Sequence, residues 1–138
     1  MAQREASSAG KASGELPLFI RTYDFVGWLV PLTNHFPRAH RHTVTKRLLD
    51  AALDFQQIVL LSNYVYGETR LAQLRLADTE LDKIRLYLRL AHRWQWINIG
   101  QYEHASRLVA ELGRLLGGWQ KVTRQTAGQP GPAAVGTG

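Results

Sequence analysis

Apolar residues recur three or four positions apart along most of the chain, whereas no stretch alternates apolar and polar residues. The first spacing is that of one face of an α-helix, and alternation would indicate a β-strand. We therefore predict an all-α protein whose helices span about 17–36, 43–66, 69–97 and 101–122.

The first predicted helix is apolar on two sides. One face holds Phe19, Tyr23, Val26, Val30 and Thr33, and another holds Phe25, Trp28, Leu32 and Phe36. Pro31 lies inside this helix. Because an interior proline removes a backbone hydrogen bond and clashes with the preceding turn, we expect a kink near Gly27 and Trp28.

The second predicted helix also has two apolar stripes. One holds Leu48, Ala52, Phe55, Val59 and Ser62, and the other holds Leu49, Leu53 and Leu60. Gly67 follows as its expected C-cap. In a chain this small, a helix with two apolar sides favours packing of one side in its own bundle and of the other on a neighbouring subunit.

The two remaining helices each have one main seam. Leu74, Leu81, Ile84 and Leu88 form the third, while the fourth repeats Leu108, Leu112 and Leu115 and places Gly113 and Gly117 four residues apart, a spacing that favours close helix contact. Short connections make consecutive helices antiparallel. We predict an up-down-up-down four-helix bundle over residues 16–124. The ends, 1–15 and 125–138, have little to bury, so we expect disordered tails there.

Three arginines lie four residues apart on the third predicted helix. Arg85, Arg89 and Arg93 follow one another at ~6 Å along the helix axis. Asp82 can reach Arg85, but Arg89 meets only like charges at this spacing, which is destabilising by a few tenths of a kcal/mol. A group outside the helix is expected to compensate the row.

Two interpretations of this row remain open. One is a solvated face or a set of salt bridges to the fourth helix, with Glu103 and Glu111 as candidate partners. The other is a row that binds phosphates, since a basic stripe is the usual footprint of a nucleic-acid-binding protein.

A second basic group surrounds the first connection, where no acid occurs from residue 37 to residue 47. Positive charge at a helix N-terminus opposes the helix dipole, which suggests a ligand that offsets the cost. For Arg41 alone, a solvated loop is the better interpretation. His40 and His42 are two apart with no carboxylate beside them, so we expect no metal site. The residues of this group are Arg38, His40, Arg41, His42, Lys46 and Arg47.

Tryptophans accompany the basic residues. Trp94, Trp96 and Trp119 could stack on bases, as aromatic side chains beside arginines do in single-strand binding proteins. Core packing is the favoured alternative, because tryptophan is mostly buried in small bundles and Trp119 follows two glycines that make room for an indole.

Composition narrows the function class. The formal net charge of +6 favours nucleic acid as a partner, with an anionic membrane second. With no cysteine, disulfides and thiolate chemistry are excluded. We find no signal peptide or membrane span and expect a soluble cytoplasmic protein. No catalytic triad, carboxylate pair or phosphate loop is present, so we expect no enzyme and no cofactor.

Three stretches together resemble a known family. They are "WLVPLTNHFPRAHRH", "IRLYLRLAH" and "AELGRLLGGW". The chain resembles the accessory variability determinant proteins of diversity-generating retroelements, which belong with the proteins encoded in intervening sequences of 23S ribosomal RNA genes. The resemblance covers roughly 16–124. The positions that match the family pattern are Pro31, Pro37, Arg38, His40, Arg85, Arg89, Glu111, Gly113, Arg114, Gly117 and Trp119.

The resemblance implies a homopentameric barrel of four-helix bundles with a basic exterior. It also implies that the protein works with the retroelement's reverse transcriptase and template-repeat RNA, or with DNA, in mutagenic cDNA synthesis and retrohoming. The arginines would then bind nucleic acid without sequence readout. Glu111, Gly113, Arg114, Gly117 and Trp119 would serve packing and subunit pairing. The alternative is an intervening-sequence-type bundle that acts as a protein-interaction scaffold.

Overall fold

Residues 15–127, which are the residues that the computed structural model describes, form four long helices and the connections between them. These residues contain no strand, which confirms the all-α fold class. None of the helices is long and apolar enough to cross a lipid bilayer. The helices are α2 (Glu15–Leu32), α3 (Lys46–Ser62), α4 (Gly67–Arg93) and α5 (Ile99–Thr126).

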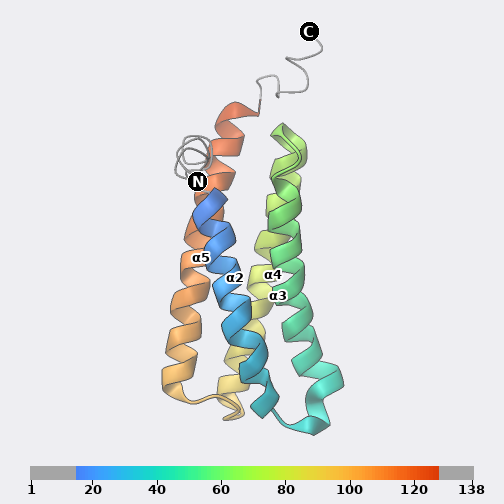
Figure 1. Cartoon of the computed structure of the whole chain (residues 1–138), viewed down its shortest axis with the longest axis vertical. Helices are drawn as coiled ribbons and strands as arrows, with labels where there is room; N and C mark the ends of the chain where they lie inside the picture. The colour runs from blue at the N-terminus through green and yellow to red at the C-terminus, as the bar shows by residue number, and fades with distance from the viewer. Residues whose placement is uncertain (1–14, 128–138) are drawn as a thin grey trace, which may run out of the picture.

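Each helix packs against two others, α2 and α4 both lying against α3 and α5. Consecutive helices run in opposite directions along the long axis of the molecule, and α5 ends near the start of α2 (Figure 1). This arrangement is the predicted up-down-up-down four-helix bundle. The connection between α2 and α3 contains two 3-10 turns and a π-helical turn, namely Thr33–His35, Arg38–His40 and Arg41–Thr45.

The seams predicted for α3 and α4 form the centre of the core. Leu48, Ala52, Phe55, Val59 and Ser62 of α3 are all buried. Leu74, Leu81, Ile84 and Leu88 of α4 are buried too, and Leu71, Ala77 and Ala91 extend that seam in both directions. Their spacing of three or four residues keeps each set on one side of its helix, so both seams are confirmed.

The two apolar faces predicted for the first helix are confirmed only in part, because Phe25 and Phe36 of the second face are buried but Tyr23 and Val30 of the first are exposed. The structure buries Leu18, Thr22, Phe25 and Leu29, whereas Tyr23 is 72% exposed. Apolar residues surround α2 on nearly all sides, so periodicity alone does not select one face. The contacts with α3 and α5 make that selection.

Several helix ends differ from the prediction. Gly67 has φ of +58° and begins α4, so it does not cap α3, which ends at Ser62. The third helix ends at Arg93, short of the predicted end at residue 97. Pro31 lies one residue before the end of α2, which is helical through Gly27 and Trp28, so the bend there stays a prediction.

The predicted tail boundaries also shift. Glu15 is the first residue of α2 and Thr126 the last of α5, so both boundaries fall inside helices. The rest of each expected tail, 1–14 and 128–138, lies outside the described residues.

A reciprocal capping box starts α5. The Asn98 side chain accepts a hydrogen bond of 2.8 Å from the Gln101 backbone N–H, and the Gln101 side chain accepts one of 2.9 Å from the Asn98 backbone N–H. These bonds satisfy two N–H groups that a helix N-terminus otherwise leaves unpaired. The start of α5 at Ile99 therefore comes two residues before the predicted one.

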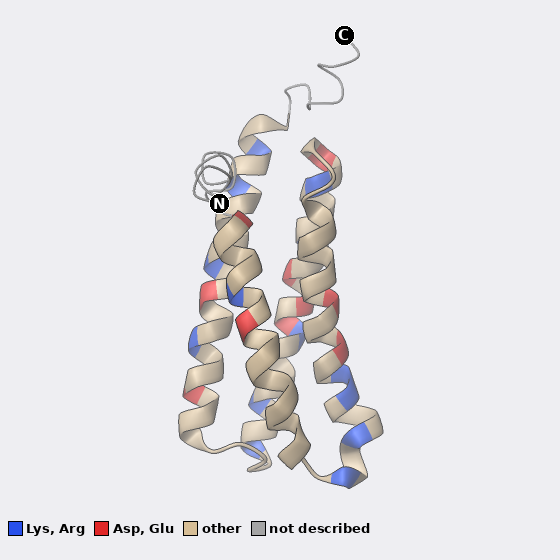
Figure 2. Ribbon diagram, viewed as in Figure 1, with Lys and Arg blue, Asp and Glu red and all other residues tan. Residues whose placement is uncertain are grey.

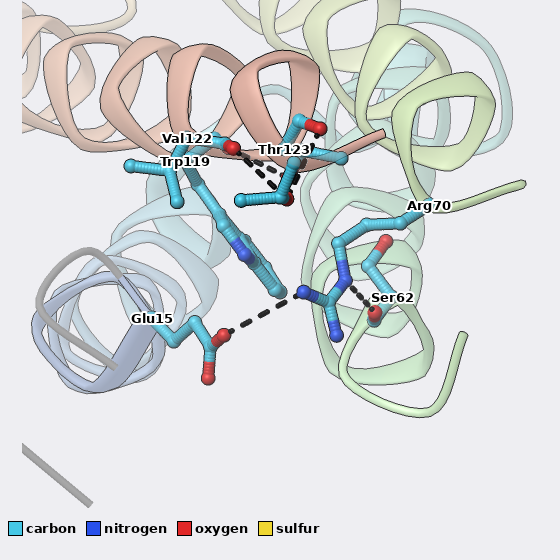
Figure 3. A network of polar contacts seen from close by, with 7 residues as sticks. Glu15, Ser62, Arg70, Trp119, Val122 and Thr123 are labelled. Carbon is cyan, nitrogen blue, oxygen red and sulfur yellow. Dashed lines mark hydrogen bonds and ion pairs between the residues drawn. The ribbon is translucent and has the colours of Figure 1, made fainter. Parts of the chain in front are cut away.

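Arg70 joins all four helices at the end of the bundle where α2 begins (Figure 3). Its Nε donates to the Ser62 carbonyl of α3 at 2.9 Å, and its Nη1 lies 3.8 Å from the Glu15 carboxylate of α2. The guanidinium also lies 5.2 Å from the ring centroid of Trp119 on α5 and 5.1 Å from that of Tyr66. Its side chain is only 15% exposed, so these contacts are shielded from water.

We expect Arg70→Ala to lower the free energy of unfolding by about 2–4 kcal/mol, because it leaves a mostly buried carboxylate without this cation. Arg70→Lys should lose an intermediate amount, since lysine keeps the charge but not the planar fork. The measurement is urea denaturation at one fixed protein concentration. The control is Arg75→Ala, an exposed arginine of the same helix, with an expected change within about 0.5 kcal/mol. Equal losses at both positions would contradict a role specific to Arg70.

Asn98→Ala should cost about 1 kcal/mol of stability, because it removes the capping acceptor of α5. The same denaturation measurement applies. Asn34→Ala is the matched control, since Asn34 is exposed and its side chain makes no hydrogen bond to another described residue. A control loss as large as that of Asn98→Ala would rule out the cap as the source.

Candidate nucleic-acid interface

The arginine row of α4 borders a pocket between α4 and α5. Arg85, Leu88 and Arg89 line it from α4, and Tyr102, Ser106, Val109 and Ala110 line it from α5. Its volume is about 210 Å³. The row continues with Arg93, the last residue of α4. The structure therefore places the predicted row along one helix edge, beside a partly apolar groove.

Arg85 differs from the other two arginines because the protein itself engages it. Its Nη1 donates to the Asp82 carboxylate at 2.8 Å, which confirms the predicted pairing. Its Nη2 would lie 2.7 Å from a Cβ at position 113, so Gly113 of α5 leaves room for the guanidinium. Arg85 thus bridges α4 and α5 while its side chain stays 40% exposed.

Arg89 and Arg93 are exposed and form no ion pair with any described residue. Glu103 and Glu111, the acids considered as partners of the row, do not pair with these arginines. Glu111 accepts a hydrogen bond of 3.0 Å from Arg21 of α2 and lies 3.7 Å from Arg114. Glu103 makes no ion pair within residues 15–127. Neither acid of α5 therefore neutralises the arginine row in the structure.

The small-residue face predicted for α5 is confirmed only in part. Gly113 meets Arg85 and Leu81 of α4 closely, but a Cβ at Gly117 would have no described atom of another helix within 4 Å. The prediction of close helix contact at Gly117 is therefore wrong within the described chain. Trp119 is 3% exposed and packs edge-on against Phe19 at 6.0 Å, as its predicted core position requires.

The basic group of the first connection divides into two parts. Lys46 pairs with Asp50 at 2.6 Å, an acid just beyond the acid-free window, and Arg47 lines a pocket shared with Asp50, Asp54 and Glu80. Asp50 therefore compensates Lys46 within the chain, while Arg47 lies near acids without an ion pair to a described residue. Arg38 and Arg41 are exposed and also form no ion pair with a described residue.

His40 meets the end of α4 through aromatic stacking. Its ring stacks on Trp96 with centroids 5.3 Å apart and an interplanar angle of 21°. Trp96 also contacts Phe36 at 5.3 Å and Trp94 at 5.1 Å. The first connection and the connection after α4 are therefore in direct contact, which brings Arg38 and Arg93 to the same end of the bundle. In Figure 2, Lys and Arg are coloured along the first connection, the start of α3 and the last turns of α4.

Core packing, the favoured role for Trp94 and Trp96, does not hold for Trp94. Trp94 is 45% exposed and Trp96 is half-buried.

His92 and His104 lie at the edge of the core. His92 stacks in parallel on Tyr102 at 4.6 Å, and His104 lies edge-on to Trp28 at 4.9 Å. Within the described part of the chain, no group of three or more His, Cys, Asp or Glu side chains is placed to hold a metal ion. The chemistry that this surface offers is that of exposed guanidinium groups and aromatic rings, which bind phosphates and bases.

One of the solved structures similar to this chain is a crystal structure of a protein with unknown function from the S23 ribosomal protein family of Bacteroides thetaiotaomicron. Its TM-score is 0.71 at 17% identity, with 78% of this chain and 98% of that chain covered. This likeness shows a common four-helix fold. No curated protein matches the chain.

A family model described as bAvd-like matches residues 18–123. The match begins in the first turn of α2 and ends in the last turns of α5, so it includes the whole bundle and the arginine row. The chain therefore belongs to the bAvd-like family, in agreement with the resemblance seen in its sequence.

Proposed function

We propose that this protein is a non-enzymatic nucleic-acid-binding subunit of a diversity-generating retroelement. It would work in the cytoplasm with the reverse transcriptase and the template-repeat RNA in mutagenic cDNA synthesis and retrohoming. Family membership supports the retroelement assignment. The observation that carries nucleic-acid binding is that Arg89 and Arg93 stand exposed at one helix edge with no acidic partner among residues 15–127.

Charge complementarity supports phosphates as the ligand. Like charges four residues apart repel, and a polyanion that lies along them removes this repulsion and releases its own counterions. Contacts of this kind hold the backbone and do not read bases, so affinity should depend strongly on salt and weakly on sequence. Arg85 has a mixed role in this proposal, because Asp82 already compensates it.

We also propose that the protein assembles as a homopentamer through the outer side of α2 and α3. A groove there is lined by Phe19, Thr22, Tyr23, Gln56, Val59 and Leu60. Ile20 and Leu53 add exposed apolar surface on the same two helices, at 50% and 46% exposure. A second copy that covers this surface would explain why both helices are apolar on two sides. The number five comes from the family resemblance.

The arginine proposal is tested by fluorescence anisotropy of a labelled structured RNA and a DNA duplex across a salt series. Wild type should bind both, with a steep linear fall of log affinity against log salt concentration. Arg89→Ala/Arg93→Ala should reduce the magnitude of that slope by about 1 to 2, because two phosphate contacts are lost.

The control variant is Arg75→Ala/Arg124→Ala, which removes the same charge from two exposed arginines near the other end of the bundle. It should keep the wild-type slope. Equal slopes for the two double variants would mean that net charge, not the row, determines binding. No binding by wild type at low salt would overturn the nucleic-acid proposal and favour the protein scaffold.

The assembly proposal is tested by native mass spectrometry. Wild type should show a mass of five chains, and Tyr23→Glu/Leu60→Glu should dissociate it, because carboxylates cannot be buried unpaired in an apolar groove. Tyr23→Phe/Leu60→Met keeps the surface apolar and should retain the wild-type mass. A monomeric wild type, or an assembly unchanged by the two glutamates, would refute the proposed interface.

A further inference from the structure

An aromatic cluster closes the end of the bundle that is opposite Arg70. It consists of Trp94, Trp96, His40 and Phe36, with Trp96 in contact with each of the other three rings. Phe36 is 5% exposed and anchors the cluster to the core, whereas Trp94 is 45% exposed. The cluster therefore runs from the core to the surface and ends in an indole in solvent.

Backbone hydrogen bonds fix the position of the two tryptophans. The Trp96 N–H donates to the Ala91 carbonyl at 2.8 Å, and the Gln95 N–H donates to the His92 carbonyl at 3.0 Å. This pair of bonds is a Schellman motif, and Gln95 occupies its left-handed position at φ of 63°. Glycine is the usual residue there, so the chain accepts strain at the residue that separates the two indoles.

The first connection supplies the opposite side of the cluster. The His40 N–H donates to the Pro37 carbonyl at 3.1 Å, which closes the 3-10 turn that carries the imidazole onto Trp96. The rings are thus held by two segments far apart in sequence. Such a surface is rigid before any ligand arrives, which lowers the entropy cost of binding.

Basic residues outnumber acidic ones at this end, although Glu103 lies close to the start of α5. Neither of the two segments that meet here, 33–47 and 83–102, contains Asp or Glu. Arg38, Arg41 and Arg93 are exposed there without an ion pair to a described residue. An exposed indole at the same end of the bundle as these unpaired guanidinium groups combines the two parts of a single-strand site, a stacking surface and a track for the backbone.

We infer that Trp94, supported by the Trp96–His40 stack, binds unpaired bases of single-stranded RNA or DNA while Arg93 and Arg38 contact the adjoining phosphates. This inference rests on the proposed function and specifies which form of nucleic acid binds at the Trp94 end of the bundle. The interior bases of a duplex cannot use the platform, because they are already stacked on one another. The arginine row of α4 would carry the backbone toward the platform, since Arg93 directly precedes Trp94.

The test uses wild-type protein and labelled oligonucleotides of about 12 nucleotides, within the range of single-strand sites. Four probes share nearly the same charge density along each strand: oligo(U), oligo(dT), an abasic phosphodiester and a DNA duplex. Trp94→Ala should weaken binding of oligo(U), oligo(dT) or both by about 5- to 150-fold, the loss of one stacked base. Binding of the abasic strand and the duplex should stay at the wild-type level.

Two variants make the result specific. Trp94→Phe keeps a ring and should retain most of the single-strand affinity, while losing the quenching of tryptophan emission that oligo(U) or oligo(dT) causes in wild type. Tyr64→Ala removes an aromatic ring that is 69% exposed in the connection after α3, at the other end, and should change nothing.

The outcomes separate the two proposals. Unchanged single-strand affinity in Trp94→Ala, or equal losses for the abasic strand, would overturn the platform. If the platform were overturned in this way but wild type still bound the duplex, the proposed function would stand without the platform. Failure of wild type to bind any of the four probes at low salt would overturn the proposed function itself.

Discussion

Burial of one seam from each of four helices dictates where every other surface of the bundle lies. A chain of 138 residues has room for one core, and α2, α3, α4 and α5 all turn one side to it. Every other helix surface is left to solvent or to partners. The arginine row lies along the edge of α4 because Ile84 and Leu88 occupy the core side of the same turns.

The arginines at the two ends of the bundle have different surroundings. At one end, Arg70 contacts other groups of the chain, namely Glu15, the Ser62 carbonyl and two aromatic rings. At the other end, Arg38 and Arg93 face solvent beside the Trp94–Trp96–His40 cluster. Removal of a cation that is buried among partners destabilises the fold, whereas a cation without an ion pair retains its capacity to bind an anion.

The arginine row shows how the same spacing can serve two purposes. Arg85 and Arg89 are four residues apart on one helix, but Asp82 and Gly113 surround the first and no acid pairs with the second within the described residues. The pairing of Arg85 with Asp82 is local and was predicted from the sequence. Arg85 and Gly113 lie on different helices. Their close approach therefore cannot be predicted from the spacing of residues along either helix.

The helices, their order and the seams of α3 and α4 could be predicted from the sequence, because a period of 3.6 residues fixes which side chains share a face. The family pattern and the core position of Trp119 could be predicted from it too. Helix packing was needed to establish which side of α2 is buried, that Gly67 begins a helix, that Glu111 binds Arg21, and that His40 stacks on Trp96. These depend on distances between residues far apart in the chain, which packing sets and local periodicity does not encode.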